Sequence, residues 1–293
     1  MKKPLHLIFN PHSGLGKKAG TLEMIRESLS KDFIVTEYIS KSREQAAATA
    51  QTICSAEPRP VIAIAGGDGT LSDVLNGCTV STVTLGIIPT GTVNIVAQEL
   101  KLPLDIPAAC RIIAQGAIRR IDIPTANGRR FMFGAGIGFD AEIVHNVTLE
   151  TKLRLGKMSY ALETLRTMRR FKPFETAVTV DGSAVYRGTA YTVIIGKSKL
   201  YAGKYVLFPE AAMDNGVLDV AVFHHLSLFK FASGCLKFFL KRPDACITLA
   251  RGTCVEVSPA GTIPVQIDGD AEGFSPVTFR IAEQQLALFA PVS

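Results

Sequence analysis

Hydrophobic positions in the first 125 residues follow two alternating patterns. Short, continuous apolar runs are typical of buried strands, whereas apolar residues that recur every three or four positions are typical of helices. The runs predict strands near 5–9, 33–39, 61–65, 84–88 and 119–123, and the recurrences predict helices near 17–30, 43–56, 70–77, 92–100 and 106–115. Regular alternation of strand and helix predicts a doubly wound parallel sheet.

After Pro124 the pattern changes to strands and turns, with helical spacing in the segment between Glu150 and Lys172 and again at 226–241. An Asp-Gly pair at 181–182 predicts a tight hairpin between two strands. Further strands are predicted at 190–196, 216–223, 253–258, 263–268, 276–281 and 285–290. We therefore predict an α/β domain over 1–124 and a β-rich domain over 125–293, and leave open whether the last strand returns to the first domain.

Three of the predicted strands run directly into turns rich in Gly, Asn and Thr, at 10–18, 66–70 and 89–94. Glycines allow the backbone to approach an anion, and the helix that follows offers unpaired N–H groups. A single turn of this kind is most often an ordinary strand-to-helix connection. Three of them at the carboxyl ends of parallel strands favour a nucleotide-binding enzyme, because open α/β sheets bind ligands at that edge.

The composition is that of a folded cytoplasmic protein. Hydrophobic residues make up 47% and charged residues 20% of the 293 positions, which is enough for a substantial core. The six cysteines have no metal-binding spacing and predict reduced thiols. The first strand begins almost at the N-terminus, and no apolar run is long enough to cross a bilayer, so we expect neither a signal peptide nor a membrane span.

Positive charge is concentrated between Glu150 and Lys172. This segment holds seven basic and two acidic residues, a net charge of +5, against +6 for the whole chain. Met158, Ala161, Leu162, Leu165 and Met168 recur there at helical spacing, with Arg166 and Arg170 turned away from that face. Two interpretations remain open: a surface helix packed through its apolar stripe, or a helix that docks on an anionic membrane surface. Nucleic-acid binding is disfavoured because no recognised motif is present.

Six motifs occur in one order along nearly the whole chain. They are Asn-Pro-His-Ser-Gly (10–14), Gly-Gly-Asp-Gly-Thr (66–70), Pro-Thr-Gly-Thr-Val-Asn (89–94), Gly-Ile-Gly-Phe-Asp (136–140), Asp-Asn-Gly-Val-Leu-Asp (214–219) and Asp-Gly-Asp (268–270). This order resembles the diacylglycerol kinase catalytic-domain family, which includes bacterial soluble lipid kinases and, more distantly, sphingosine, ceramide and NAD kinases. The resemblance implies a nucleotide-binding α/β domain and a β-sandwich-like domain.

The resemblance also implies where ATP and Mg²⁺ bind. Asp68 would organise Mg²⁺ or its waters, although a helix N-cap is its ordinary structural role, and both roles can hold together. Lys17 would add a point charge, and Ser40 matches a nucleotide-contacting hydroxyl. The ATP phosphates are expected among Asn10, Pro11, Ser13, Gly14, Lys17, Ser40, Gly66, Gly67, Gly69, Thr70 and Thr92.

For the lipid acceptor, the family assigns an acid of the Asp-Gly-Glu motif as the base. Here both ends are aspartates, so Asp268 and Asp270 are both candidates, and a type I′ hairpin is the structural alternative. The resemblance places Asn94 and Lys157 near phosphate or a head group, and an ordinary surface lysine is the structural alternative for Lys157. The same resemblance implies a structural Mg²⁺ at Asp214, Asn215 and the Val217 carbonyl, although Asn215 stands where relatives carry an acid.

The predicted activity is transfer of the ATP γ-phosphate to a lipid hydroxyl by a cytoplasmic enzyme at the inner membrane surface. The sequence leaves the acceptor open among diacylglycerol, monoacylglycerol, sphingoid bases and phosphatidylglycerol. A soluble nucleotide acceptor is the nearest alternative, because NAD kinases share the 66–70 turn. They carry an acidic residue after the downstream Asn, whereas Ile95 follows Asn94 here. A catalytically silent nucleotide- or lipid-binding protein of the same fold is the other alternative.

Overall fold

A computed structural model describes residues 2–147, 157–201, 205–224 and 247–291, and the side chains of 157–161 lie outside that description. The chain forms two compact units. Unit 1 contains residues 1–123, 213–215 and 282–293, and unit 2 contains 124–212 and 216–281. After residue 123 the chain therefore returns to unit 1 at 213–215 and again at 282–293.

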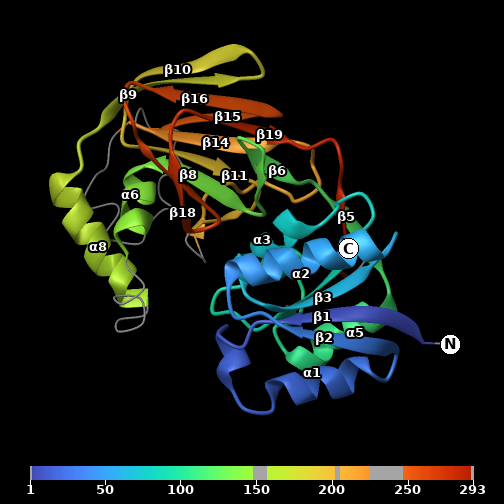
Figure 1. The fold of residues 1–293 in the computed structure, drawn as a ribbon. Coiled ribbons are helices and arrows are strands. Elements are labelled where there is room, and N and C mark those ends of the chain that lie inside the picture. The colour runs from blue at the N-terminus through green and yellow to red at the C-terminus, as the bar shows by residue number, and fades with distance from the viewer. Residues whose placement is uncertain (1, 148–156, 202–204, 225–246, 292–293) are drawn as a thin grey trace. The chain divides into compact units, whose positions relative to one another are not determined.

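Unit 1 is built on one six-stranded sheet in the order β2-β1-β3-β4-β20-β5 (Figure 1). The first five of these strands run parallel, and β5 runs antiparallel to β20. β20 comes from the C-terminal end of the chain and occupies the position between β4 and β5. The strands are β1 (Lys3–Phe9), β2 (Phe33–Ile39), β3 (Val61–Gly66), β4 (Thr84–Pro89), β5 (Ile118–Ile121) and β20 (Leu286–Phe289).

Helices cover both faces of this sheet (Figure 1). Ile25 and Leu29 of α1 and Ile113 of α5 share one apolar cluster with the sheet residues Leu7 and Ala63. Local signals fix where helices begin: the side chain of Ser42 caps α2, and that of Asp105 caps α5. The helices are η1 (Leu15–Lys17), α1 (Thr21–Leu29), α2 (Arg43–Ala56), α3 (Asp68–Gly77), α4 (Ile95–Glu99) and α5 (Ile106–Gln115).

Unit 2 contains two six-stranded sheets and a two-stranded ribbon, β12-β13. One sheet has the order β10-β9-β16-β19-β6-β7, and the other has the order β15-β14-β11-β8-β17-β18. The strands are β6 (Pro124–Ala126), β7 (Arg129–Arg130), β8 (Gly134–Gly138), β9 (Phe174–Val180), β10 (Ser183–Ala190), β11 (Thr192–Gly196), β12 (Leu200–Tyr201), β13 (Tyr205–Val206), β14 (Leu218–Phe223), β15 (Ile247–Gly252), β16 (Cys254–Pro259), β17 (Pro264–Ile267), β18 (Asp270–Phe274) and β19 (Val277–Ile281).

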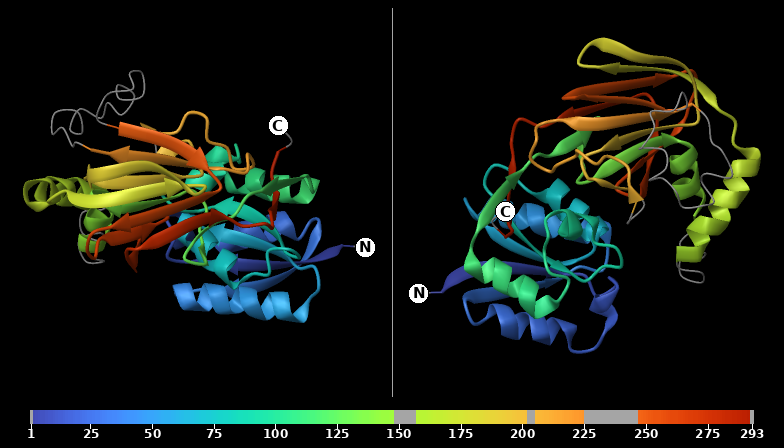
Figure 2. Two further views of the ribbon diagram at one scale, coloured as in Figure 1. Left: turned by 90° about the horizontal axis from the view of Figure 1, so that it is seen from above. Right: turned by 180° about the vertical axis from the view of Figure 1, so that it is seen from behind.

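The two large sheets of unit 2 enclose one apolar core (Figures 1 and 2). Val178 and Phe279 come from one sheet and Ile137 and Val220 from the other, and all four side chains are fully buried in the same cluster. Inner faces that share a core define a β-sandwich. Asp181 has φ 47°, and the Gly that follows it has φ 80°, as the predicted hairpin between β9 and β10 requires.

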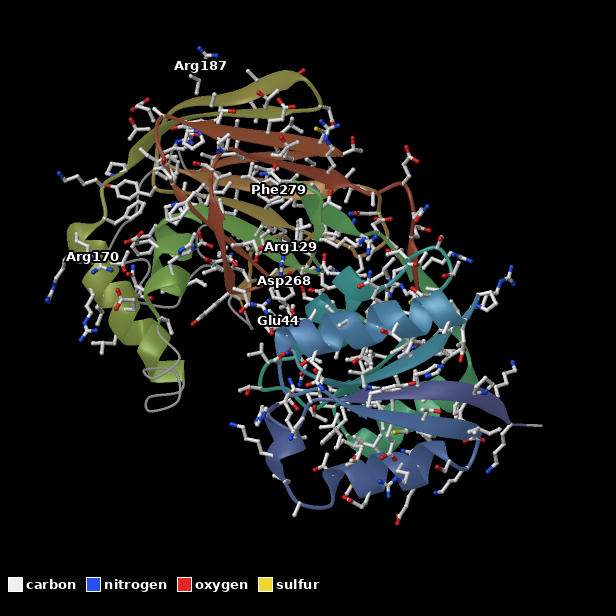
Figure 3. The ribbon with its side chains drawn as sticks, in the orientation of Figure 1. Glu44, Arg129, Arg170, Arg187, Asp268 and Phe279 are labelled. Carbon is white, nitrogen blue, oxygen red and sulfur yellow. The ribbon has the colours of Figure 1, made fainter. Side chains whose placement is uncertain are left out.

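Within its described residues, unit 2 has the helices α6 (Phe139–Asn146) and α8 (Lys157–Arg170). Of the two interpretations left open for this helix, packing through the apolar stripe does not hold for its two leucines, Leu162 and Leu165. Glu163 and Thr167 are buried, whereas Leu162 is 40% and Leu165 is 55% exposed. Arg170 approaches Glu163 at 2.8 Å, so a charged and hydrogen-bonded face, not the leucine stripe, is the one that packs (Figure 3).

Cys54, Cys78, Cys110 and Cys254 are free thiols; Cys54 and Cys254 are half-buried and the other two are buried. Cys235, Cys246 and the helix expected at 226–241 lie outside the described residues. Across the described part of the chain, none of the helices combines the length and apolar composition that a membrane span requires.

Candidate active site

The three Gly-, Asn- and Thr-rich turns meet at one edge of the unit 1 sheet. Each turn follows one of three adjacent strands, β1, β3 and β4. Backbone hydrogen bonds join them: Asn10 N donates to Ala65 O at 2.9 Å, and Thr90 N donates to Gly66 O at 3.0 Å. The predicted convergence of three phosphate-compatible turns therefore holds in the structure.

Side chains of the three turns are also linked to one another. Asn10 Nδ2 donates to Thr70 Oγ1 at 2.8 Å, and the hydroxyls of Ser13 and Thr90 lie 2.7 Å apart. The sequence analysis selected Thr92 from the third turn and missed Thr90. In the structure Thr92 is exposed, whereas Thr90 is fully buried and its carbonyl also accepts from Leu15 N at 2.7 Å. The position of Thr90 directly after the buried strand β4 was the signal in the sequence that could have identified it.

Two glycines let the turns approach each other closely. A Cβ placed on Gly91 would lie 2.5 Å from Gly67 Cα and 2.6 Å from Asn94 Oδ1. Side chains do not tolerate contacts this short, so the two backbones can touch only because both residues lack a Cβ. Bare backbone with N–H groups at the start of a helix is the surface that phosphate groups bind.

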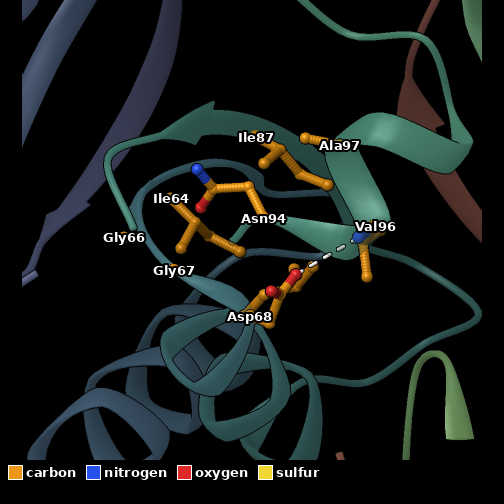
Figure 4. A pocket seen from close by; sticks show the side chains of 9 residues that line it. Ile64, Gly66, Gly67, Asp68, Ile87, Asn94, Val96 and Ala97 are labelled. Atoms are coloured by element: carbon orange, nitrogen blue, oxygen red, sulfur yellow. Dashed lines mark hydrogen bonds between the residues drawn. The ribbon is translucent and has the colours of Figure 1, made fainter. Parts of the chain in front are cut away.

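Asp68 caps a helix other than its own. Its Oδ2 accepts from Ile95 N at 2.9 Å and its Oδ1 accepts from Val96 N at 3.2 Å, both at the start of α4 (Figure 4). The structural role that the sequence offered, a helix N-cap, is therefore present, but at α4; the N-cap position of α3 is Gly67, which provides no side-chain cap. Burial raises the pKa of Asp68, and the amides of Ile95 and Val96 act against that rise.

Asn94 lies beside Asp68 and has a left-handed backbone, with φ 56°. Its Nδ2 donates to Gly91 O at 2.9 Å. Its Oδ1 is buried and makes no hydrogen bond within the part of the chain that the structure describes. Asn94 and Asp68 line a small pocket with Gly66 and Gly67 (Figure 4). A carboxylate and an unused amide oxygen beside bare backbone fit a Mg²⁺ that keeps most of its waters and binds phosphate.

The remaining predicted nucleotide contacts are distributed around these turns. Ser40 is buried after β2, and its hydroxyl donates to Ser42 O at 2.9 Å. Lys17 is exposed at the end of η1. Pro11 and Gly14 lie within the first turn, and Gly69 is the second residue of α3. The side chain of Lys157 falls outside the description.

In unit 2, Asp268 and Gly269 form the turn between β17 and β18, with φ of 51° and 82°. This is the two-residue hairpin that the sequence offered as the structural alternative. The Asp268 carboxylate is buried and accepts three backbone hydrogen bonds, from Met132 N at 2.8 Å, Phe133 N at 3.0 Å and Gly134 N at 3.3 Å (Figure 3). Asp270, the first residue of β18, is half-buried.

Asp140 is a buried carboxylate to which the sequence assigned no role in the site. It hydrogen-bonds to Gln266 in β17, the strand that precedes this turn. Asp140 Oδ1 accepts from Ala141 N at 2.8 Å and Thr192 Oγ1 at 2.9 Å. Its Oδ2 accepts from Gln266 Nε2 at 3.1 Å and from the Tyr201 hydroxyl at 3.3 Å. Burial raises the pKa of Asp140, and its hydrogen-bond donors lower it. Four donors match the four acceptor positions of an ionised carboxylate.

The position of Asp140 explains part of the Gly-Ile-Gly-Phe-Asp motif. A Cβ on Gly136 would lie 2.0 Å from Asp140 Oδ2, so the carboxylate folds back onto β8 only where that strand carries a glycine. Gly136 also faces Gln266 in the sheet register. Gly136 therefore leaves room for the Asp140 carboxylate beside β8. Its partner Gln266 lies on β17, the strand that leads to the 268–270 turn.

The predicted structural Mg²⁺ site does not fit the side chains present. Asp214 Oδ2 already accepts from Arg119 Nε at 2.9 Å and Nη2 at 2.8 Å. The Val217 carbonyl accepts from Lys197 Nζ at 2.9 Å. Asn215 contributes no charge, and among the described residues no three His, Cys, Asp or Glu side chains gather as a metal site. Cationic side chains contact two of the three predicted ligands, Asp214 and the Val217 carbonyl, so these two groups do not fit the expected metal site.

Comparison with known families agrees with both units. A family model described as the diacylglycerol kinase catalytic domain matches residues 4–126. A second, described as the YegS C-terminal NAD kinase beta sandwich-like domain, matches residues 135–290. The chain therefore belongs to the diacylglycerol kinase family in which these two domains are combined. The predicted resemblance and the predicted fold class, an α/β domain followed by a β-sandwich-like domain, are confirmed.

Individual relatives span nearly the same length. A diacylglycerol kinase of Staphylococcus saprophyticus is 27% identical over 99% of this chain and 96% of its own length. A crystal structure of a proposed diacylglycerol kinase from Bacillus anthracis is 26% identical, with a TM-score of 0.82 over 99% of this chain and 95% of the other. An NAD kinase from Archaeoglobus fulgidus in complex with ATP is 15% identical, with a TM-score of 0.56 over 97% of this chain and 93% of the other; it shares the fold.

Proposed function

We propose that this protein is an ATP- and Mg²⁺-dependent kinase that transfers the γ-phosphate to the hydroxyl of a lipid, with diacylglycerol as the first candidate. The observation that carries the proposal is the convergence of three phosphate-compatible turns around Asp68 and Asn94 in a chain of the diacylglycerol kinase family. The class of acceptor is supported by the names of the relatives.

In this proposal unit 1 binds the nucleotide. Backbone N–H groups of the turns and the helix that follows bind the phosphates, and Asp68 with Asn94 holds the hydrated Mg²⁺. The metal would neutralise charge on the transferred phosphoryl group. Asp68 is fixed for this role, because the two amides at the start of α4 hold both of its oxygens in place and leave lone pairs for other partners.

Asp270 is the proposed base in unit 2. Asp268 is ill suited to accept a proton, because three backbone N–H groups already bind its carboxylate and stabilise its charged form. Its three bonds instead fix the turn from which Asp270 projects. Asp270 would accept the proton of the lipid hydroxyl as that oxygen attacks the γ-phosphate.

Transfer of labelled γ-phosphate from ATP to a panel of lipids in mixed micelles tests the activity, with NAD as a soluble acceptor in the same panel. A labelled lipid supports the proposal and identifies the acceptor. Label on NAD alone would overturn the lipid assignment, and no transfer would favour a silent binding protein.

Asp270→Asn tests the proposed base. The expected result is a fall in kcat of about 10²- to 10⁴-fold with little change in the KM for ATP, because a general base contributes about that much. Glu272→Gln is the matched control: Glu272 lies two residues further along β18 and pairs with Arg129 at 3.1 Å. Equal kcat values for the two variants would exclude Asp270 as the base.

We also propose that α8 docks on an anionic bilayer. Leu162 and Leu165 are exposed on the described part of this helix, with Arg166 and Arg169 exposed beside them. Apolar side chains enter the interface, and each nearby basic residue adds about 1 kcal/mol on anionic lipid. Glu163 lies 3.6 Å from Arg166 and offsets part of that residue's charge.

Sedimentation with vesicles of phosphatidylglycerol and phosphatidylcholine tests the docking. Leu162→Ser with Leu165→Ser is expected to weaken binding, and Leu249→Ser, at a 54% exposed leucine of β15, is expected to leave it unchanged. Binding to phosphatidylglycerol that is insensitive to salt and to the α8 substitutions would contradict this proposal.

A further inference from the structure

A lysine is fully buried in unit 2 at the point where the family resemblance expects a metal. Lys197 follows β11 directly and has an exposed fraction of 0%. Its Nζ reaches across to the start of β14 and donates to the Val217 carbonyl at 2.9 Å. A buried ammonium is costly unless its surroundings are built for positive charge, so the contacts of Lys197 identify a cation site.

The surroundings of Lys197 are those of a cation site. Asp219, the second residue of β14, pairs in register with Gly196 and is itself buried. Burial raises the pKa of Asp219, while Arg251 and the nearby Lys197 lower it. Arg251 Nε approaches Asp219 Oδ1 at 2.7 Å. Val217 O and Asp219 thus present a carbonyl and a negative charge to the region that Lys197 enters.

The other two predicted ligands are also poorly suited to a divalent cation. Arg119 binds Asp214 through two nitrogens, and Asn215 is neutral. A Mg²⁺ bound to Val217 O at about 2.1 Å would lie within about 5 Å of the Lys197 nitrogen, where like charges repel. The residues present therefore favour an internal ammonium over a divalent ion.

We infer that the Lys197 ammonium supplies, within this chain, the positive charge that the resemblance assigns to a structural Mg²⁺, so that the 214–219 loop is held without a metal. The inference does not rest on the proposed kinase activity, because it concerns the stability and the metal content of the free protein.

Thermal unfolding of the full chain, without nucleotide, tests this inference in EDTA and in millimolar MgCl₂. The wild-type Tm is expected to be the same in both, and desalted protein is expected to contain no stoichiometric metal. Lys197→Met is expected to lower the Tm by about 5 °C or more, because it leaves the buried Val217 carbonyl without its ammonium donor and leaves Arg251 as the cation beside Asp219. Lys199→Met, at an exposed lysine two residues along the chain, is expected to leave the Tm unchanged.

A second variant pair separates a cation site from ordinary packing. Asn215→Asp returns an acid two residues before Val217, so Lys197→Ala with Asn215→Asp is expected to gain a Tm that rises with MgCl₂. Lys199→Ala with Asn215→Asp is expected to lack this gain. A Mg²⁺-dependent rise in the wild-type Tm that persists in Asp68→Asn would overturn the inference, as would equal Tm values for Lys197→Met and Lys199→Met. The wild-type measurement decides the question even if Lys197→Met does not fold.

Discussion

Gln266 Oε1 accepts a hydrogen bond from Gly269 N at 2.9 Å, while Gln266 Nε2 donates to Asp140 Oδ2 at 3.1 Å. Asp140 is surrounded by groups that can donate to it, and the Nε2 end of the Gln266 amide is the end that faces it. The amide oxygen is thereby directed at the backbone of the 268–270 turn. A carboxylate 126 residues earlier in the chain thus helps to set the turn that carries the proposed base.

Gln266→Leu tests this connection. The variant keeps the apolar volume and loses both hydrogen bonds, so we expect kcat to fall about 10- to 100-fold, as small displacements of a catalytic group commonly cause. The KM for ATP should stay the same. Steady-state kinetics with the lipid acceptor give both constants.

Thr192→Val is the matched control for Gln266→Leu, since Thr192 binds the other oxygen of the same carboxylate, Oδ1. The variant also removes the contact of this hydroxyl with the Ile137 carbonyl, so it is expected to cost about 1–2 kcal/mol of stability, at about 1 kcal/mol per hydrogen bond, and little kcat. If neither variant reduces kcat, the network contributes to stability alone; if both reduce kcat equally, the Gln266–Gly269 bond has no separate role in setting the turn.

Removal of the Asp68 carboxylate is expected to abolish phosphate transfer. Asp68→Ala removes the proposed Mg²⁺ ligand, and kcat should fall to background while the circular dichroism spectrum stays that of the wild type. The cost in stability is expected to be about 1–2 kcal/mol because Ile95 N and Val96 N lose their acceptor. Near-normal turnover in this variant would refute the assigned site.

The raised pKa of Asp68 predicts how stability depends on pH. Where the folded pKa lies above the unfolded value of about 3.9, the folded state binds more protons, so the free energy of unfolding falls as pH rises, by at most about 1.4 kcal/mol per pH unit. This contribution is complete below the unfolded pKa and is lost as pH rises through the folded pKa. Asp68→Asn should remove it.

Urea unfolding of the wild type and Asp68→Asn from about pH 4 upward measures this contribution. The expected result is a wild-type stability that declines relative to the variant as pH rises. Parallel curves would mean that Asp68 has an ordinary pKa. Asp140 has a raised pKa for the same reason and is unchanged in both proteins, so it cancels in the comparison.

Gly91→Ala is expected to separate the two turns that touch through bare backbone. The new methyl group would overlap Gly67 Cα and Asn94 Oδ1, and overpacking of this kind costs about 1–3 kcal/mol. ATP binding should weaken as well, since Asn94 lines the pocket beside Asp68. Thr92→Ala, at the exposed neighbour, should stay within about 0.5 kcal/mol of the wild type. Isothermal calorimetry and urea unfolding measure the two effects.

The amino-acid sequence alone determined the elements and the edge of the sheet where the turns gather. Apolar runs located β1, β3 and β4, and each was followed by Gly, Asn and Thr residues, so the convergence of the turns followed from parallel strand order. These features are local: the period of the side chains and the residues that a turn accepts are written in neighbouring positions.

The tertiary structure decided which distant groups the polar side chains of these motifs bind. Asp68 caps α4, 27 residues further on; Asp268 is bound by amides about 135 residues away; and Lys197 takes the carbonyl of Val217. Likewise, α8 buries Glu163 and exposes its leucines. Such pairings depend on strand register and on where helices pack, and neighbouring residues do not specify either. The sequence therefore indicated which residue types the site contains, and long-range contacts determined what each side chain binds.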